Sequence, residues 1–371
     1  MKEIFSKIKE SFSEVVEFVK KQPRIWLVVS LFSILILVVA GGGYLLLART
    51  SFLDFFSRNS SAQEINNENP SSESGFHRLI DGVAVSDETK INPPLFAVQI
   101  ENMIDARPLS GIARADLVYE TLAEAGITRL LVIYAADGDV SEIGPVRSAR
   151  PYFLDWAEEY GALYAHSGGS PEALRLIPQY DIFDLNEFAN GRFFWRSNAR
   201  YMPHNLYTSV ELLNDAFAAK NGEVKNFIPW QFKDEVEENA RPSEEKRIKI
   251  YFSTKTYEVG WQYNRESNDY LRYQAGVLEQ DRDGWEVRAK NIAVQFTKMT
   301  VLDTVGRKDI ETIGSGEAIV FQDGIRIDGT WRKEARGDRT KFFDADGAEI
   351  KFNPGVTWVE VVPIETEVTM E

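Results

Sequence analysis

The stretch from residue 143 to residue 174 holds the side chains whose types and spacing could do chemistry. Within it, two glycine-containing loops each lead into an expected helix start, and two arginines and a histidine lie close by. The N-terminus of a helix carries unpaired N–H groups and a partial positive charge, so it attracts anions. Guanidinium groups match the geometry of phosphate and carboxylate groups. We therefore predict an anion pocket lined by Arg147, Arg150, His166, Gly168, Gly169 and Ser170.

Two expected helices position this pocket. Residues 151–160 show helical spacing, with Ser148 as a candidate N-cap and a proline in the first turn. Residues 171–177 form the second helix, which Ser170 caps in the same manner. The pattern thus predicts two helix N-termini that could face one ligand, although it names no reaction and no catalytic residue.

The histidines leave alternatives open. His166 follows an expected buried strand at 162–165, and ligands of open α/β sheets lie beyond the carboxyl ends of the strands. It could act as an acid or base near neutral pH, or form a structural hydrogen bond to the backbone. His204 and Asn205 lie in an expected loop, where they either fix that loop or contact the ligand.

Arg107 and Arg129 extend the set of candidate ligand-binding residues. The alternative for any of these arginines is an internal ion pair, because the chain contains 57 acidic residues. The acidic partners expected for such pairs are Glu101, Asp116, Glu120 and Glu124. We expect no metal site and no cofactor, since the chain has three scattered histidines, no cysteine, no Walker loop and no GxSxG elbow. The alternative is a carboxylate-held Mg²⁺ near Asp116 or Glu120, and only alongside a phosphate ligand.

The composition is that of an exported acidic protein. The formal net charge is −15, and a negative field of that size argues against nucleic-acid partners. The absence of cysteine excludes disulfides and thiolate metal sites. A local cluster of arginines is therefore more informative here than it would be in a basic chain.

Residues 25–48 form a run of 24 positions without a charge, long enough to cross a bilayer. Six basic residues precede this run, so we expect one transmembrane anchor, a cytoplasmic N-terminus and an extracytoplasmic main body. Residues 1–24 are expected to form a cytoplasmic amphipathic segment on the inner leaflet. Signal-peptide cleavage near residues 38–40 is the alternative, and we favour the retained anchor.

The rest of the chain divides by composition. Residues 49–75 are a polar linker, whose last 19 residues span roughly 24 Å root-mean-square as a flexible coil. Residues 76–232 alternate expected strands and helices, which indicates an α/β domain. A charged connector at 233–247 follows. Residues 248–371 show short alternating strands separated by Asp-Gly turns, which indicates a mostly antiparallel β domain.

Several motifs resemble the bacterial YerB-like family of lipoproteins, whose N- and C-terminal domains have no assigned function. The motifs are PLSGIARADLVYE (108–120), AEAGITR (123–129), IGPVRSARPY (143–152), HSGGSPEAL (166–174), PHNLYT (203–208), GSGEAIVFQDG (314–324), GTWRKE (329–334) and PGVTWVEVVP (354–363). The resemblance covers most of residues 80–363. Family members commonly carry a lipidated cysteine, which this chain lacks, so the helical anchor would replace the lipid. The family supplies no agreed catalytic residues.

A fainter resemblance links RAD (114–116), IGPVRSAR (143–150) and GGSPEAL (168–174) to the LytR-CpsA-Psr enzymes of Gram-positive cell walls. That resemblance implies transfer of glycopolymers from a polyprenyl-pyrophosphate carrier by means of arginines and a divalent cation. We therefore expect a membrane-anchored envelope protein that binds an anionic ligand or acts as a scaffold, with a wall glycopolymer transferase as the alternative. The expected partners are the membrane and cell-wall precursors or wall-assembly proteins.

Overall fold

Apolar runs of six to eight residues form the first strands of the protein. The computed structural model describes residues 75–371, and its first strands are β1 (Leu95–Glu101), β2 (Leu117–Leu122) and β3 (Thr128–Ala135). Every residue of these three strands is buried. Burial at every position is typical of strands that are covered on both faces, and it explains why the runs do not alternate with polar residues.

Three helices follow these strands. They are α3 (Pro151–Glu158), α4 (Pro171–Gln179) and α6 (Val210–Ala219). Ser170 and Ser209 cap α4 and α6 by accepting hydrogen bonds from N–H groups three residues on. Between the helices lie β4 (Leu163–His166), β5 (Asp184–Asn186), α5 (Glu187–Asn190), β6 (Trp195–Arg196) and β7 (Leu206–Tyr207).

The N-cap of α3 differs from the sequence prediction. Arg150 occupies that position, and no side chain caps the helix. Ser148 lies two residues earlier, where its Oγ donates to the carbonyl of Ser167 at 3.0 Å. The prediction for Ser148 was wrong because the chain before α3 is held extended by backbone hydrogen bonds from Ala149 to Gly168 and from Ser170 to Ala149.

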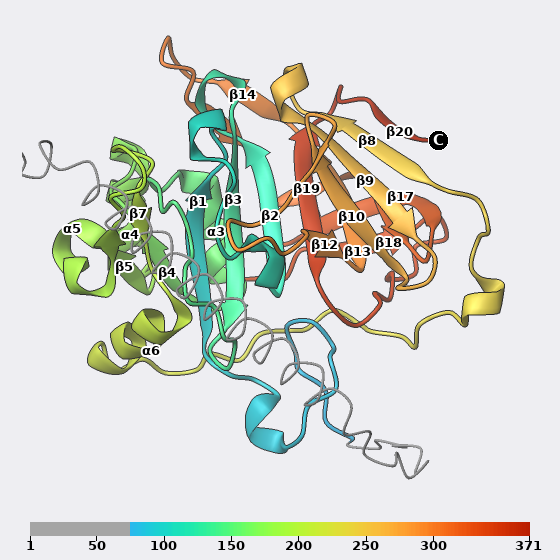
Figure 1. Cartoon of the computed structure of the whole chain (residues 1–371), viewed down its shortest axis with the longest axis horizontal. Helices are drawn as coiled ribbons and strands as arrows, with labels where there is room; N and C mark the ends of the chain where they lie inside the picture. Colours follow the sequence, from blue (N-terminus) through green and yellow to red (C-terminus); the bar gives the residue numbers. More distant parts are fainter. Residues whose placement is uncertain (1–74) are drawn as a thin grey trace, which may run out of the picture. The chain divides into compact units, whose positions relative to one another are not determined.

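A ten-stranded sheet runs through the described part of the chain (Figure 1), in the order β18-β17-β16-β13-β19-β2-β3-β1-β4-β5. Its later strands are β13 (Asn291–Thr297), β16 (Gly314–Gln322), β17 (Ile325–Lys333), β18 (Lys341–Asp344) and β19 (Thr357–Pro363). β19 pairs in parallel with both β2 and β13. β4 pairs in parallel with β1 and β5. These pairings place the carboxyl ends of β1, β2, β4 and β5 at the same edge of the sheet.

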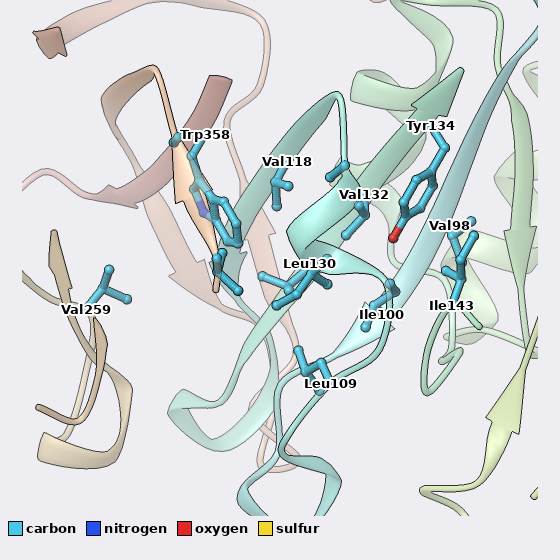
Figure 2. Packing of buried hydrophobic residues seen from close by; sticks show 14 of the residues in the cluster. Val98, Ile100, Leu109, Val118, Leu130, Val132, Tyr134, Ile143, Val259 and Trp358 are labelled. Atoms are coloured by element: carbon cyan, nitrogen blue, oxygen red, sulfur yellow. The ribbon is translucent and has the colours of Figure 1, made fainter. Parts of the chain in front are cut away.

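A smaller six-stranded sheet covers part of one face. It comprises β8 (Arg247–Tyr251), β9 (Glu258–Asn264), β10 (Asp269–Gln274), β11 (Val277–Leu278), β12 (Arg288–Ala289) and β20 (Val368–Met370). β9 alternates buried and half-buried residues, as a strand with one face on the core should. Trp261 of this sheet meets Trp358 of β19 edge to face at 5.3 Å between ring centroids. Figure 2 shows Val259 and Trp358 from the two sheets within one apolar core.

The opposite face of the large sheet packs against α3 and the loop after β17. Trp156 of α3 stacks on Tyr119 of β2 at 5.1 Å. Glu159, which directly follows α3, is buried and accepts hydrogen bonds from Lys333 Nζ at 2.7 Å and Arg339 Nη1 at 3.0 Å. These contacts fasten an early helix to strands that come about 170 residues later.

The fold class expected from the sequence is confirmed for the described residues, which contain an α/β region and a later, mostly antiparallel β part. The domain boundaries at 76–232, 233–247 and 248–371 stay predictions, and strands from both regions share the ten-stranded sheet. The expected segments 1–24 and 25–48, and all of the linker up to residue 74, lie outside the described residues. Within 75–371, no helix combines the length and apolar character that a membrane crossing requires.

Candidate site at the carboxyl ends of the strands

Charged side chains gather where the parallel strands of the large sheet end. Glu101 is the last residue of β1, and Glu124 follows the end of β2 by two positions. β3 runs in the opposite direction, so Arg129 near its start lies at the same edge, paired with Glu101 in register. This edge is where ligands of α/β sheets usually bind, because the loops that leave parallel strands open there.

Glu101 is the acidic centre of one half of the edge. Its carboxylate lies 3.3 Å from Nε of Arg147 and 2.9 Å from Nδ1 of His204. The residue is 2% exposed. Burial raises the pKa of the Glu101 carboxyl, and the charges of Arg147 and His204 oppose that rise. The ion pair expected as the alternative for Arg147 is thus confirmed.

Glu124 is the acidic centre of the other half. Arg150 donates hydrogen bonds to both carboxylate oxygens, from Nε to Oε1 and from Nη2 to Oε2, the latter at 2.8 Å. Arg129 Nη2 lies 3.7 Å from the same Oε2. Burial alone would raise the pKa of Glu124, but the hydrogen bond from Arg150 and the two guanidinium charges lower it. Arg129 is itself buried, and burial together with the charge of Arg150 lowers its pKa to about 10.

The structure therefore brings three predicted arginines together. Arg129 and Arg150 both donate to the carbonyl of Ser148, at 3.2 and 3.3 Å, and the charges of Arg147 and Arg150 both depress the pKa of Arg129. Three guanidinium groups share two carboxylates at this edge, in a chain whose net charge is −15. The side chain of Arg147 forms no hydrogen bond within the described residues, and its Nε is buried without an acceptor.

His166 does not join this arginine cluster. Its Nδ1 lies 2.6 Å from the carbonyl of Gly168, and its Nε2 lies 2.6 Å from Oδ1 of Asp184. The ring is fully buried and stacks on Tyr164 at 5.0 Å. The structural alternative for His166, a hydrogen bond to the backbone, is confirmed.

The residues that follow His166 hold the turn before α4. Gly168 has a φ of +61°, and the ring of Phe188 lies where a side chain at this position would project. Gly169 pairs with Ala149 across a parallel bridge, where added side-chain atoms would meet Leu174. Ser170 has its hydroxyl engaged as the cap of α4, accepting from Ala173 N at 3.2 Å. These contacts assign local structure to all three residues, and their contact with a ligand stays a prediction.

Arg107 and Asn205 lie apart from the arginine cluster. Arg107 donates to Asn102 and to the carbonyl of Thr256, and it packs over the ring of Tyr257, so it links the two sheets. Asn205 accepts from Arg196 Nη1 at 3.2 Å and donates to the carbonyl of Ser197, which braces the loop between β6 and β7.

A cavity of about 630 Å³ opens beside Arg150. It lies where α3 and α4 begin, so the two helix N-termini expected from the sequence do border one hollow. Its far wall is the hairpin of β14 (Met299–Val301) and β15 (Lys308–Ile310). The charged residues in the lining are Arg150, Asp155, Glu172, Asp303, Arg307, Lys308 and Asp309.

The hairpin residues Arg307 and Lys308 were missed by sequence reasoning. They lie more than 150 positions after Arg150, and no local pattern links them to the helix starts. Among residues 75–371, no group of three or more histidine, cysteine, aspartate or glutamate side chains is arranged to hold a metal ion.

The described part of the chain carries the two domains of one protein family, an N-terminal and a C-terminal one. The chain belongs to the family described as "Protein of unknown function (DUF3048)": residues 81–223 match its N-terminal domain and residues 248–359 its C-terminal domain. It is 33% identical over 276 residues to "Putative lipoprotein YerB" of Bacillus subtilis (strain 168), an alignment covering 72% of this chain and 80% of that protein.

A solved structure supports the fold. The crystal structure of the YerB protein from Bacillus subtilis matches with a TM-score of 0.70 at 29% identity, over 79% of this chain and 99% of that one. The crystallised relative thus corresponds almost wholly to a part of this chain about as long as residues 75–371. The YerB-like family predicted from the motifs is confirmed.

Proposed function

We propose that this protein is an extracytoplasmic envelope protein that binds a phosphate or carboxylate group at Arg129, Arg147 and Arg150. The observation that carries the proposal is the state of Arg147. Its side chain is about three-quarters buried, and its Nε, 3.3 Å from a Glu101 oxygen, is buried and makes no hydrogen bond within the described residues. A buried donor without an acceptor is costly, and an anion that accepted from it would remove that cost.

The surroundings of the cluster support the same ligand class. The neighbouring cavity of about 630 Å³ falls in the size range of small-molecule sites, roughly 300–1,000 Å³. Arg150 belongs to both the cluster and the cavity, and the far wall offers Arg307, which pairs with Asp303, and Lys308 beside Asp309. A phosphate-bearing wall precursor fits this combination of forked donors and helix N-termini.

The proposal also includes the placement of the protein. A lipoprotein relative supports a membrane-associated, extracytoplasmic location. We add that residues 25–48 cross the membrane once with the N-terminus in the cytoplasm, since that segment carries no charge and follows six basic residues.

The test is a thermal-shift and calorimetric screen of the purified extracytoplasmic part against inorganic pyrophosphate, glycerol phosphate and lipid-linked wall precursors. We expect Arg147→Ala to weaken binding of the active compound by about tenfold or more, the usual worth of a charge-assisted hydrogen bond. Arg326→Ala is the matched control, because Arg326 pairs with Asp328 on a surface strand away from the cluster. Unfolding of Arg147→Ala, or unchanged affinity, would contradict the proposal.

A scaffold without a small ligand is the second candidate. It is favoured by the fact that Arg147, Arg150 and His166 each contact their own carboxylate. Under that alternative, no compound of the screen shifts the melting temperature, and Arg147→Ala lowers stability instead. The transferase alternative requires turnover of a polyprenyl-pyrophosphate-linked glycopolymer, which product analysis of the lipid-linked precursors after incubation with the protein measures.

A further inference from the structure

We propose that residues 188–204, here called the basic loop, form a surface that rests on anionic lipid headgroups of the membrane. The basic loop begins in α5 at the end of the large sheet, next to its last strand β5 (Figure 1). Three large apolar side chains stand out into solvent there. Phe188 is 76% exposed, Tyr201 is 92% exposed and Met202 is 69% exposed.

The charge of the basic loop is opposite to that of the chain. No acidic residue occurs between Phe188 and Val210, whereas three arginines and one histidine do. The whole chain carries 57 acidic and 42 basic residues. A positive segment with exposed aromatic and apolar side chains is typical of surfaces that lie at the interface of an anionic bilayer, where basic residues meet headgroups and aromatic rings lie at their level.

The basic loop is held in place from beneath. Phe193 and Phe194 are buried in the apolar core, and the Arg200 guanidinium donates to the carbonyls of Ala106 and Pro108. His204 lies against Glu101. The exposed side chains are thus presented by a fixed backbone, so little conformational entropy is lost when they meet a flat surface.

Arg192 is the cation best placed for a headgroup. Its side chain is exposed and packs over the ring of Phe193 at 4.6 Å, and it has no carboxylate within 4 Å among the described residues. Arg196 and Arg200, by contrast, bond to Glu187 and to backbone carbonyls. The Arg192 charge is therefore available for an external phosphate.

A second exposed apolar tip provides a contrast within the same chain. The β14–β15 hairpin exposes Val301, Leu302 and Val305 by 59–65%, but its Arg307 and Lys308 are balanced by Asp303 and Asp309. Such a tip has no net positive charge to attract an anionic surface. The basic loop differs from this hairpin in its net positive charge, and a short linker to a membrane segment is expected. For these two reasons we propose anionic lipid as the binding partner of the basic loop.

The test uses residues 75–371, a segment about as long as the part of this chain that the crystallised relative matches. A hexahistidine tag at residue 75 holds the protein on vesicles with nickel-chelating lipid, composed either of phosphatidylcholine or with about 30 mol % phosphatidylglycerol. The chain has no cysteine, so Met202→Cys and, as control, Val305→Cys each carry a single bimane. We expect quenching by nitroxide-labelled lipid at position 202 on anionic vesicles only, and none at position 305.

Sedimentation with the same vesicles, without the tether, measures the charge contribution. We expect Arg192→Gln to lower the partition coefficient about fivefold, the equivalent of about 1 kcal/mol for one basic residue at the surface. Arg326→Ala should leave the partition unchanged, because Arg326 pairs with Asp328 on a surface strand outside both the basic loop and the proposed anion site. Equal quenching at positions 202 and 305, or the same partition on neutral vesicles, would overturn the proposal and favour a protein partner instead.

Discussion

The core around Glu159 and the strand edge around Glu101 and Glu124 use the same residue types in opposite ways. Glu159 is fully buried, and both of its oxygens accept hydrogen bonds, from Lys333, Arg339, Thr340 and Tyr119. At the strand edge, three guanidinium groups share two carboxylates, and the side chains of Arg147 and Arg150 remain partly exposed to solvent. A saturated ion cluster fixes the packing of elements, whereas an unsaturated one can still accept a ligand.

The largest effect should come from breaking the saturated cluster. Glu159→Gln leaves the ammonium of Lys333 and the guanidinium of Arg339 buried without a counter-charge. We expect the free energy of unfolding to fall by about 3–5 kcal/mol, measured by urea denaturation. The neighbouring Glu158→Gln is the control and should cost less than about 1 kcal/mol, because Glu158 is partly exposed and lies 3.8 Å from Arg336. Equal losses in the two variants would mean that Glu159 is not a structural centre.

Asp281 sharpens the comparison because it is a buried carboxylate that pairs with no cation among residues 75–371. It accepts from the N–H groups of Ile112 and Ala113, and burial raises its pKa to about 7. Between about pH 4 and about pH 7, the Asp281 carboxyl is protonated in the folded protein but ionised in the unfolded chain, where its pKa is the usual 3.8. The free energy of unfolding therefore decreases as the pH rises through this interval.

Asp281→Asn removes this titration. We expect the variant to gain stability relative to the wild type across that pH interval, by on the order of 3 kcal/mol. Denaturation curves at closely spaced pH values measure the difference. A difference that stays constant with pH would show that Asp281 is already ionised in the folded protein at low pH.

The smallest expected change in stability comes from Ser170→Ala, a variant that also tests whether Ser170 belongs to the binding site. Ser170→Ala removes the cap of α4 and should cost about 1 kcal/mol of stability. Ser209→Ala is the matched control, because Ser209 caps α6 in the same way. Any ligand found in the screen should bind both variants equally if Ser170 is only a cap, and a selective loss of affinity in Ser170→Ala would place it in the binding site.

Local features of the fold were predictable from the sequence, and distant pairings were not. The runs at 95–100 and 117–122 became strands, and Ser170 and Ser209 became caps, because both depend on neighbouring residues alone. Composition also suggested Glu101 and Glu124 as partners for arginines. Which arginine met which glutamate depends on the tertiary fold, since Arg150 and Glu124 are 26 positions apart on different elements.

The candidate site was predictable only in part for the same reason. The two helix starts and Arg150 follow from the local sequence, but the far wall of the cavity comes from the hairpin at 299–310. The sequence also gave no sign that β19 would lie in parallel between β2 and β13, because β-pairing order depends on contacts across the whole chain.

The position of β19 has a consequence for how the protein matures. This strand lies in the interior of the large sheet, where its Thr357 pairs in register with Leu117 of β2. The central hydrogen bonds therefore form only after the residues of β19, far along the chain from β2, have been made. If the chain is exported, the early strands reach the outer side of the membrane before β19 is available to pair with them. Their edges are then unpaired for a time, and unpaired strand edges promote aggregation. A truncation that removed only the final strands would leave a gap in the middle of the sheet.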